Sequence, residues 1–435
     1  MDYIKGVIGL LVFITIAYTF SNNRKAINWR LVIIGVTLQI LFGVLITQVG
    51  FISDFFQWLS TGFVRFLNFT SDGAQFIFGD LAKNSYVDKG AKHSLGMIFA
   101  FQILPVIIFF SAISAALYYL GILQKIVFVI AYVMSKTMGL SGPESLSAAG
   151  NIFLGQTEAP LLVKPFIKNM TYSELMCLMT GGMATIAGSV LAAFVYFLGG
   201  DDPAQQAKFA SHLLSASIMS APAAIVIAKI MLPETKPVNK ELTLSKDSLG
   251  VNIIDAMAIG AGDGLKLALN VGGMLLAFIA VVALLNAGLV AIGDWVGVNE
   301  TIKTNTGGAF KGLSMEYILG QISRPFAYLM GVAWEDTLLV GSLIGQKTVI
   351  NEFVAYESLR DMLQAKSLAN EKSIIVATYA LCGFSNFSSI AIQVGGISSM
   401  APNQQSNLSK LGLRALLAAT LACFMTATIA GTITN

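Results

Sequence analysis

Long apolar runs recur along the whole chain and limit it to a membrane fold. A helix that crosses the hydrocarbon core of a bilayer needs about 20 mostly apolar residues. Runs close to this length predict eight spans, at residues 6–20, 31–46, 97–121, 172–198, 209–231, 265–292, 374–398 and 409–433. Only 12% of the residues are charged, about half the share in a soluble domain. We therefore expect an all-α polytopic membrane protein.

The basic residues between these spans predict how the chain is oriented. Arg24, Lys25 and Arg30 lie between the first two spans, and residues 234–248 carry three lysines. Because cytoplasmic loops collect Lys and Arg, both loops are placed inside, which puts both termini outside. Residues 51–92 are aromatic with scattered charges and predict one or two amphipathic helices at the outer interface.

The composition also excludes several classes of function. The net charge of +3 is spread along loops without a basic face, so nucleic acid is not expected as a partner. Cys177, Cys382 and Cys423 lie in apolar segments without paired spacing, which indicates packing and no disulfide framework. His93 and His212 are isolated, so no transition-metal site or other cofactor is expected. The first apolar run lacks the features of a secretory signal and is interpreted as a retained helix.

Residues 138–169 and 309–356 do not fit as spans, because polar residues interrupt their middles. The first segment contains 150-GNIFLGQTEAPLLVKPF-166. The nine residues from Gly155 to Lys164 give about 13 Å of helix, close to half of a hydrocarbon core about 30 Å thick. We predict that both segments are re-entrant hairpins, the first entering from the inside and the second from the outside.

The two segments share a weak internal repeat. Each has an acid, a Gly six residues later, a Gly-Gln pair and then a Glu, although the last spacings differ. The residues are Glu144, Gly150, Gly155, Gln156 and Glu158 in the first segment, and Glu335, Gly341, Gly345, Gln346 and Glu352 in the second. Repeats that enter from opposite sides form an inverted repeat, a plan common among secondary transporters. Non-helical backbone at the midplane survives only inside protein or beside a water-filled cavity.

The carboxylate of Glu158 is the first candidate site residue. A charge at the bilayer centre costs about 2.5–3.5 kcal/mol on insertion scales. Backbone N–H groups at a hairpin tip could satisfy it, or it could accept from a ligand or bind an ion. Gln156 and Thr157 beside it supply both donors and acceptors, which favours recognition of a solute.

A second group of polar residues interrupts the apolar run 378-TYALCGFSNFSSIAIQV-394. Its Ser and Asn side chains could join helices through hydrogen bonds. Alternatively, the segment is unwound, and Asn386 and Ser389 point into a cavity that Phe384 walls.

The segment 181-GGMATIAGSVLAAFV-195 is the third candidate. Thr185 and Ser189 are four residues apart and would share a helical face. This face could serve only for close packing of small residues. Alternatively, Thr185 and Asn151 coordinate a hard cation, for which oxygen ligands suit Na⁺. The combined inventory of carboxylates, amides, hydroxyls and an aromatic ring suits a small neutral solute with many donors and one flat face.

Four motifs in order resemble the concentrative nucleoside transporter family in its bacterial, eight-span form. They are 150-GNIFLGQTEAPLLVKPF-166, 181-GGMATIAGSV-190, 345-GQKTVINEFVAY-356 and 382-CGFSNFSSIAIQVG-395, and the similarity runs from about residue 90 to the end. The resemblance implies a homotrimer that couples nucleoside uptake to Na⁺ or H⁺. It also implies an elevator-type mechanism, in which a transport domain with both hairpins slides against a scaffold domain.

The resemblance also implies a division of the chain and a localisation. Residues 1–121 would hold scaffold helices and an interfacial helix, and residues 234–300 a cytoplasmic linker, an interfacial helix and a scaffold helix. Residues 122–233 and 301–435 would each form half of the transport domain, with one re-entrant hairpin. The expected location is the bacterial cytoplasmic (inner) membrane, and the expected solutes are nucleosides such as uridine, cytidine and adenosine.

Carried onto this chain, the resemblance implies a role for each site residue. The nucleobase would contact Gln156, Thr157 and Glu158. The ribose hydroxyls would contact Glu352, Asn386 and Ser389, and the pocket would be walled by Phe384 and Val190. Sodium would be held by the side chains of Asn151 and Thr185 and the carbonyl oxygens of Leu154 and Ile186. Ser189 and Val190 match positions that tune base preference.

The leading hypothesis is therefore sodium-coupled nucleoside symport by alternating access. The near alternative is proton coupling, in which Glu158 or Glu352 takes the proton. A membrane-embedded enzyme would use paired glutamates as acid and base, but the chain shows no nucleophile motif and no metal set. A passive channel disagrees with two hairpins around a closed site.

Overall fold

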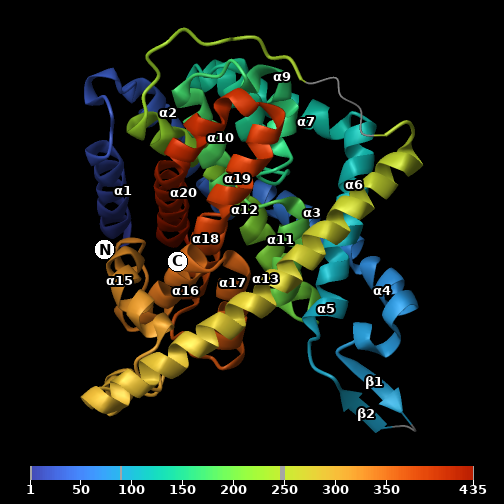
Figure 1. Ribbon diagram of the computed structural model, residues 1–435, viewed down its shortest axis with the longest axis vertical. Helices are drawn as coiled ribbons and strands as arrows, with labels where there is room; N and C mark the ends of the chain where they lie inside the picture. The colour runs from blue at the N-terminus through green and yellow to red at the C-terminus, as the bar shows by residue number, and fades with distance from the viewer. Residues whose placement is uncertain (1, 89–90, 245–249, 435) are drawn as a thin grey trace.

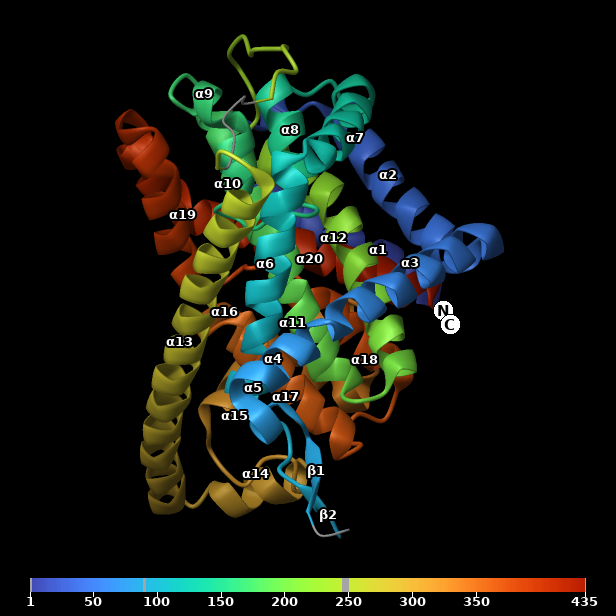
Figure 2. The ribbon, with the colours of Figure 1, turned by 90° about the vertical axis from the view of Figure 1, so that its right-hand side faces the viewer.

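The computed structural model describes residues 2–88, 91–244 and 250–434, which form helices and one short β-hairpin. Figures 1 and 2 show the helices around a central bundle, with α13 along one edge and the two termini next to each other. The N-terminal elements are α1 (Asp2–Thr19), η1 (Arg24–Ala26), α2 (Trp29–Gln48), α3 (Gly50–Asn68), α4 (Thr70–Phe78), η2 (Gly79–Ala82), β1 (Ser85–Asp88), β2 (Ala91–Ser94), α5 (Phe99–Gln102), α6 (Leu104–Tyr119) and α7 (Ile122–Met138).

Two similar halves follow, separated by a long helix. The first comprises α8 (Gly142–Gly150), η3 (Ala159–Val163), α9 (Lys164–Ile167), α10 (Tyr172–Ala184), α11 (Gly188–Gly199) and α12 (Pro203–Met231). Between the halves lie α13 (Ile253–Val296), α14 (Asn299–Asn305) and α15 (Met315–Leu329). The second comprises η4 (Trp334–Asp336), α16 (Thr337–Val349), α17 (Glu352–Gln364), α18 (Glu371–Leu381), α19 (Phe387–Met400), η5 (Pro402–Gln404) and α20 (Gln405–Ile433).

Within the described residues, six helical segments are long and apolar enough to cross a membrane. They are residues 29–48, 99–119, 172–199, 203–231, 253–296 and 402–433, and each matches a predicted span. The other two predicted spans take different forms. The first lies in α1, whose apolar helix Tyr3–Thr19 is shorter. The seventh is divided into α18 and α19. The expected all-helical membrane fold is confirmed at this level.

Two regions differ from the predicted secondary structure. Residues 51–92 begin with the expected helices, α3 and α4, but end in strands β1 and β2, which pair antiparallel. Strands of four residues are too short for a period-two pattern to be recognised. The predicted interfacial helix and scaffold helix within residues 234–300 form the single helix α13 of 44 residues. Its length is about 66 Å, roughly twice the thickness of a hydrocarbon core.

The repeat is clear in the order of the elements. In each half a helical hairpin is followed by a helix broken in its middle and then by a helix of 29 residues, α12 or α20. Figures 1 and 2 place α8 and α9 at the end of the molecule near residues 232–244, and α16 and α17 at the opposite end. The Gly-Gln pairs, however, are not equivalent, because Gln156 lies at a hairpin tip and Gln346 inside α16. The weak sequence repeat was therefore aligned wrongly at these residues.

Capping residues explain where several of these helices begin. The side chains of Ser141 and Thr171 accept from the third helical N–H of α8 and α10, and a Glu completes each capping box. Asn351 and Asn386 accept in the same way at the start of α17 and α19. The polar residues that interrupt the apolar runs are thus the ones that divide the helices.

The two basic loops lie at the same end of the molecule, as their charge predicts. The N–H of Asn22 donates to the carbonyl of Met231 at 3.0 Å. The base of the first hairpin is fixed at this end too. A buried ion pair joins Lys229 to Glu144, and the carbonyl of Asn239 accepts from the N–H of Gly142 at 2.9 Å. The segment after α12 therefore holds the start of α8 in place.

The two broken helices cross at their breaks. The N–H of Phe384 donates to the carbonyl of Thr185 at 3.3 Å. Gly383 has φ +137°, and a Cβ there would lie 2.8 Å from the carbonyl oxygen of Ala184. Only glycine combines this backbone conformation with so close an approach. The crossing places both breaks at one point in the interior.

Replacing Gly383 with Ala should therefore destabilise the protein, by about 1–3 kcal/mol for the backbone strain alone. The matched control is Gly395→Ala in α19, where an added Cβ would meet nothing within 4 Å. Thermal unfolding in detergent should show a lower midpoint temperature for Gly383→Ala and an unchanged midpoint for the control. An unchanged midpoint for Gly383→Ala would contradict the close crossing.

Candidate functional site

A cavity of about 100 Å³ lies where the first hairpin, the second hairpin and the two helix breaks meet. All eight residues predicted to contact the solute line it: Gln156, Thr157, Glu158, Val190, Glu352, Phe384, Asn386 and Ser389. They come from four separate segments of the chain, so the fold alone brings them together. This cavity is the candidate binding site.

The tip of the first hairpin contributes three consecutive polar side chains. Gln156 is buried, Thr157 is exposed and Glu158 is half-buried. The carboxylate of Glu158 accepts from the N–H of Gly155 at 3.3 Å. One backbone donor therefore contacts the carboxylate, which leaves acceptor capacity for a solute.

Glu352 and Asn386 form the polar centre of the opposite wall. The amide nitrogen of Asn386 donates to the carboxylate of Glu352 at 2.6 Å, while its oxygen accepts from the N–H of Ser389 at 2.9 Å. Glu352 lies in the first turn of α17, where the partial positive charge of a helix N-terminus stabilises an anion. The orientation of both side chains is thus fixed before a solute binds.

Apolar residues form the remaining walls. Phe384 and Val190 lie there as expected, together with Ala187. Leu267, Val271 and Met274 of α13 close one side, and the sequence analysis did not identify them. Their spacing of four and seven residues puts them on one helical face. The pattern was hidden because α13 is apolar on nearly every face.

Two polar residues were also missed. Asn351 lines the cavity, and its side-chain nitrogen is buried without a hydrogen-bond partner among the described residues. Gln393 is buried in α19 and contacts Gln156 through its amide. Asn351 could have been found as an N-cap candidate immediately before Glu352, and Gln393 as a lone amide within an apolar run.

The predicted sodium ligands Asn151 and Thr185 are both buried beside Gly181. Neither polar atom of the Asn151 side chain has a hydrogen-bond partner within the part of the chain that the structure describes. A Cβ at Gly181 would lie 3.0 Å from the Asn151 amide nitrogen, so this glycine leaves space for the side chain. The hydroxyl of Thr185 donates to the carbonyl of Gly181 at 2.9 Å. A buried amide oxygen without a hydrogen-bond partner is available to coordinate a cation.

The backbone around these residues fits the same interpretation. The carbonyl of Phe153 accepts from Gly188, and that of Thr185 from Phe384. Among the described residues, the carbonyls of Leu154 and Ile186 accept no backbone hydrogen bond. Two side-chain and two backbone oxygens could therefore hold Na⁺, which prefers such ligands. No cluster of three His, Cys, Asp or Glu side chains that could hold a metal occurs in the described residues.

One expectation about this region is wrong. Thr185 and Ser189 do not share a helical face, because α10 ends at Ala184 and α11 begins at Gly188. Thr185 has an extended backbone, with φ −118° and ψ 170°. The break frees the backbone near Thr185, so it supports the cation interpretation over simple packing of small residues.

A lysine side chain lies at the helix break of the second half. The ammonium of Lys347, buried in α16, donates to the carbonyl of Ala380 at 2.8 Å in the last turn of α18. A positive charge at a helix C-terminus is stabilising, because the last carbonyls have no partners within the helix. The corresponding end of α10 lies instead beside the unpartnered Asn151.

A neighbouring cavity of about 230 Å³ shares Glu158 with the candidate site. It lies between α6, α13 and the return arm of the first hairpin, and its polar residues include Ser111, Ser114, Lys164 and Asp263. Lys164 begins α9, at the same end of the molecule as the basic loops (Figure 2). The lining of this cavity therefore runs from Glu158 of the candidate site to Lys164 near that end.

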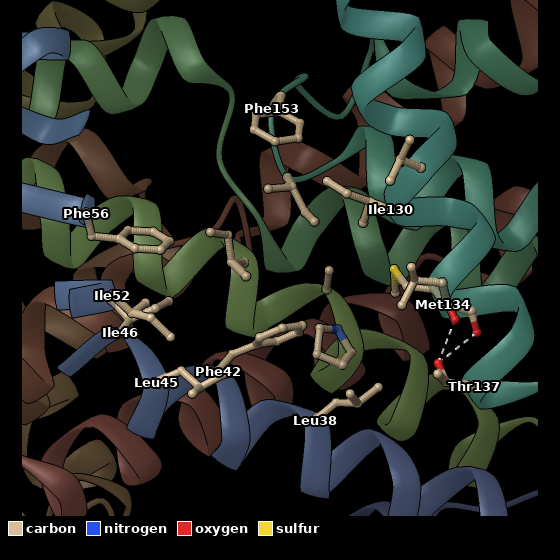
Figure 3. Close-up of a pocket in the computed structure, with 16 residues that line it drawn as sticks. Leu38, Phe42, Leu45, Ile46, Ile52, Phe56, Ile130, Met134, Thr137 and Phe153 are labelled. Carbon is tan, nitrogen blue, oxygen red and sulfur yellow. Dashed lines mark hydrogen bonds between the residues drawn. The ribbon is translucent and has the colours of Figure 1, made fainter. Parts of the chain in front are cut away.

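A larger cavity of about 340 Å³ lies between α2, α3, α7 and α12 (Figure 3). Its lining is apolar except for Thr137, whose hydroxyl donates to the carbonyl of Val133 at 2.8 Å. The cavity has no free polar group that could orient a hydrogen-bonding solute. Size alone therefore does not identify the functional site of this protein.

Comparisons with known proteins agree with the geometry. Residues 8–81 and 212–431 match the N-terminal and C-terminal models of the Na⁺ dependent nucleoside transporter, and residues 100–201 match a model described as nucleoside recognition. An uncharacterized transporter of Haemophilus influenzae is 42% identical over 99% of this chain and 98% of its own length. The sodium/nucleoside cotransporter 1 of Mus musculus is 39% identical over 97% of this chain and 62% of its own length.

The fold also matches a solved structure. The structure of CNTnw in an inward-facing substrate-bound state superposes with a TM-score of 0.88 and 38% identity, over 100% of this chain and 98% of that one. The relatives are transporters, and this chain is not an enzyme. Taken with the cavity at the two helix breaks, these matches show that the chain belongs to the concentrative nucleoside transporter family.

Proposed function

We propose that this protein is a sodium-coupled symporter that imports nucleosides by alternating access. The main support is the single cavity that collects all eight predicted side chains, with the unpartnered Asn151 nearby. The cavity combines oxygen acceptors, amides and an aromatic ring. Ribose hydroxyls donate to the carboxylate of Glu352, and the ring of Phe384 packs on a flat base.

Sodium is the proposed coupling ion because its ligands connect the first hairpin to the helix break. Asn151 and Leu154 belong to the hairpin tip, while Thr185 and Ile186 belong to the break. Asn151 lies five residues before Gln156, so a bound ion would order this tip and raise the affinity for the solute. Conversely, a bound solute would raise the affinity for the ion by the same factor. Each Na⁺ that crosses a membrane potential of 100 mV contributes about 2.3 kcal/mol. This free energy corresponds to a ratio of inside to outside solute concentration of roughly fifty.

The hairpins at opposite ends support the proposed inverted, re-entrant arrangement. In an elevator-type mechanism, the transport domain would consist of residues 122–233 and 301–435 and would slide against residues 1–121 and 234–300. Leu267, Val271 and Met274 belong to the proposed scaffold and wall the cavity, so sliding of the transport domain would change access to the cavity. The path from inside would be the neighbouring cavity at Glu158.

The homotrimer that the resemblance implies would need a surface on which partner chains pack, and α13 offers an exposed apolar one. Only 6% of its most apolar 18 residues is buried within one chain, and Leu269, Leu276 and Leu284 are more than 60% exposed. We propose that partner chains or lipid cover this surface. The basic loops would face the cytoplasm of a bacterial cell, which puts the protein in the inner membrane with both termini outside.

Uptake into proteoliposomes tests the proposal. Labelled uridine, cytidine and adenosine should accumulate against a gradient when Na⁺ is outside, and replacing Na⁺ by choline at constant pH should abolish accumulation. Uptake that follows a proton gradient instead would favour proton coupling through Glu158 or Glu352. Equilibration without accumulation would identify a passive channel.

The substitution Glu352→Gln should weaken nucleoside binding roughly 10- to 100-fold, because it removes a charged acceptor worth about 1.5–3 kcal/mol. The dissociation constant for uridine, measured on the purified protein, gives the effect. The matched control is Glu335→Gln, an exposed acid in η4 outside the cavity. Near-normal affinity in Glu352→Gln would exclude the proposed ribose contact.

The substitution Thr185→Ala should raise the Na⁺ concentration for half-maximal uptake by roughly tenfold, the size expected for one lost charged contact. The maximal rate should change less. Thr428→Ala in α20 is the control, because its buried hydroxyl also donates four residues back, to Phe424. A sodium requirement that is equal in the two variants would argue against Thr185 as a ligand.

A further inference from the structure

Gln393 is a buried amide of α19 that the proposed binding contacts do not use. Its side-chain nitrogen lies 3.2 Å from the carbonyl oxygen of Met179 and 3.2 Å from the side-chain oxygen of Gln156. It is 1% exposed. Gln393 therefore joins the first broken helix, the hairpin tip and the second broken helix.

The hydrogen bonds fix the orientation of both amides. A backbone carbonyl can only accept, so the nitrogen of Gln393 must face Met179. The same nitrogen faces Gln156, so Gln156 must present its oxygen to it. The nitrogen of Gln156 is then directed to the hydroxyl of Ser389, at 3.1 Å. The carbonyl of Met179 thus determines which end of Gln156 faces the cavity.

Glycine in α10 makes room for this pair. A Cβ at Gly182 would lie 2.4 Å from the Gln393 nitrogen and 3.1 Å from the Cβ of Gln156. Any larger residue would displace the amide of Gln393. The packing of α10 therefore fixes where the amide of Gln393 lies, and the hydrogen bonds determine which end of it faces Met179.

An amide nitrogen carries two hydrogens, and the bond to Ser389 uses one of them. The other is available to a solute, because Gln156 lines the cavity. Two residues along the chain, Glu158 presents a carboxylate. The hairpin tip thus offers a donor and an acceptor side by side.

We propose that Gln393 is a positioning residue that makes Gln156 a hydrogen-bond donor toward the base. The site then favours nucleosides whose base has a carbonyl oxygen beside a ring N–H, as in uridine and inosine. Cytidine and adenosine have an exocyclic amine beside a ring acceptor, which is the reverse pattern. This inference rests on the proposed nucleoside site and specifies its substrates.

Competition binding of the four nucleosides to the purified protein tests the inference. Uridine and inosine should bind more tightly than cytidine and adenosine by roughly three- to tenfold, as expected for one hydrogen bond. In Gln393→Met, which keeps the side-chain length but has no N–H, the Gln156 amide can rotate and the ratio should approach one. Gln393→Leu provides a second variant with the same expected ratio.

The matched control is Gln39→Met. Gln39 is another buried glutamine, in α2, and donates to the hydroxyl of Thr426 at 2.8 Å, outside the cavity. Its substitution should leave the ratio unchanged. Equal affinities in the unsubstituted protein, or an unchanged ratio in Gln393→Met and Gln393→Leu, would overturn the inference. Failure of all four nucleosides to bind would instead overturn the proposed function.

Discussion

The hydrogen bond from the N–H of Phe384 to the carbonyl of Thr185 is the contact on which the site depends. A helix broken inside a membrane protein exposes backbone groups that neither lipid nor the helix can satisfy. Here each break supplies a partner to the other. The crossing directs the N-termini of α11 and α19 and the tip of the first hairpin toward one cavity. The groups proposed to recognise a solute are thus placed by the same contact that makes the breaks tolerable.

The two halves are similar in order of elements but differ at their breaks. In the second half, the side-chain nitrogen of Lys347 donates to the carbonyl of Ala380 at the end of α18. In the first half, the buried side chain of Asn151 has no hydrogen-bond partner among the described residues, and it lies near the end of α10. The first half therefore has a buried amide that could coordinate an ion where the second half has a lysine ammonium at the equivalent helix end. This asymmetry is the physical basis for proposing sodium in the first half.

The sequence was most informative where polar residues interrupt apolar runs. Glu158 was identified as a candidate because a charge is expensive to bury without a purpose, whereas Glu352 was assigned through the family resemblance. The structure brings both to one cavity. The wall formed by α13 was not predictable, since Leu267 and its neighbours do not differ from a lipid-facing surface. The helical face assumed for Thr185 and Ser189 failed because spacing alone does not reveal a break.

The size of the cavity constrains how a solute reaches it. Ligand sites usually enclose about 300–1,000 Å³, whereas this cavity encloses about 100 Å³. Half-buried Glu158 lines both this cavity and the neighbouring cavity of about 230 Å³. Helix α13 walls both cavities, so the proposed sliding of the hairpin along α13 would change the lining of both. In the proposed mechanism, binding and access would be coupled through the hairpin tip, which also holds the proposed sodium ligands Asn151 and Leu154.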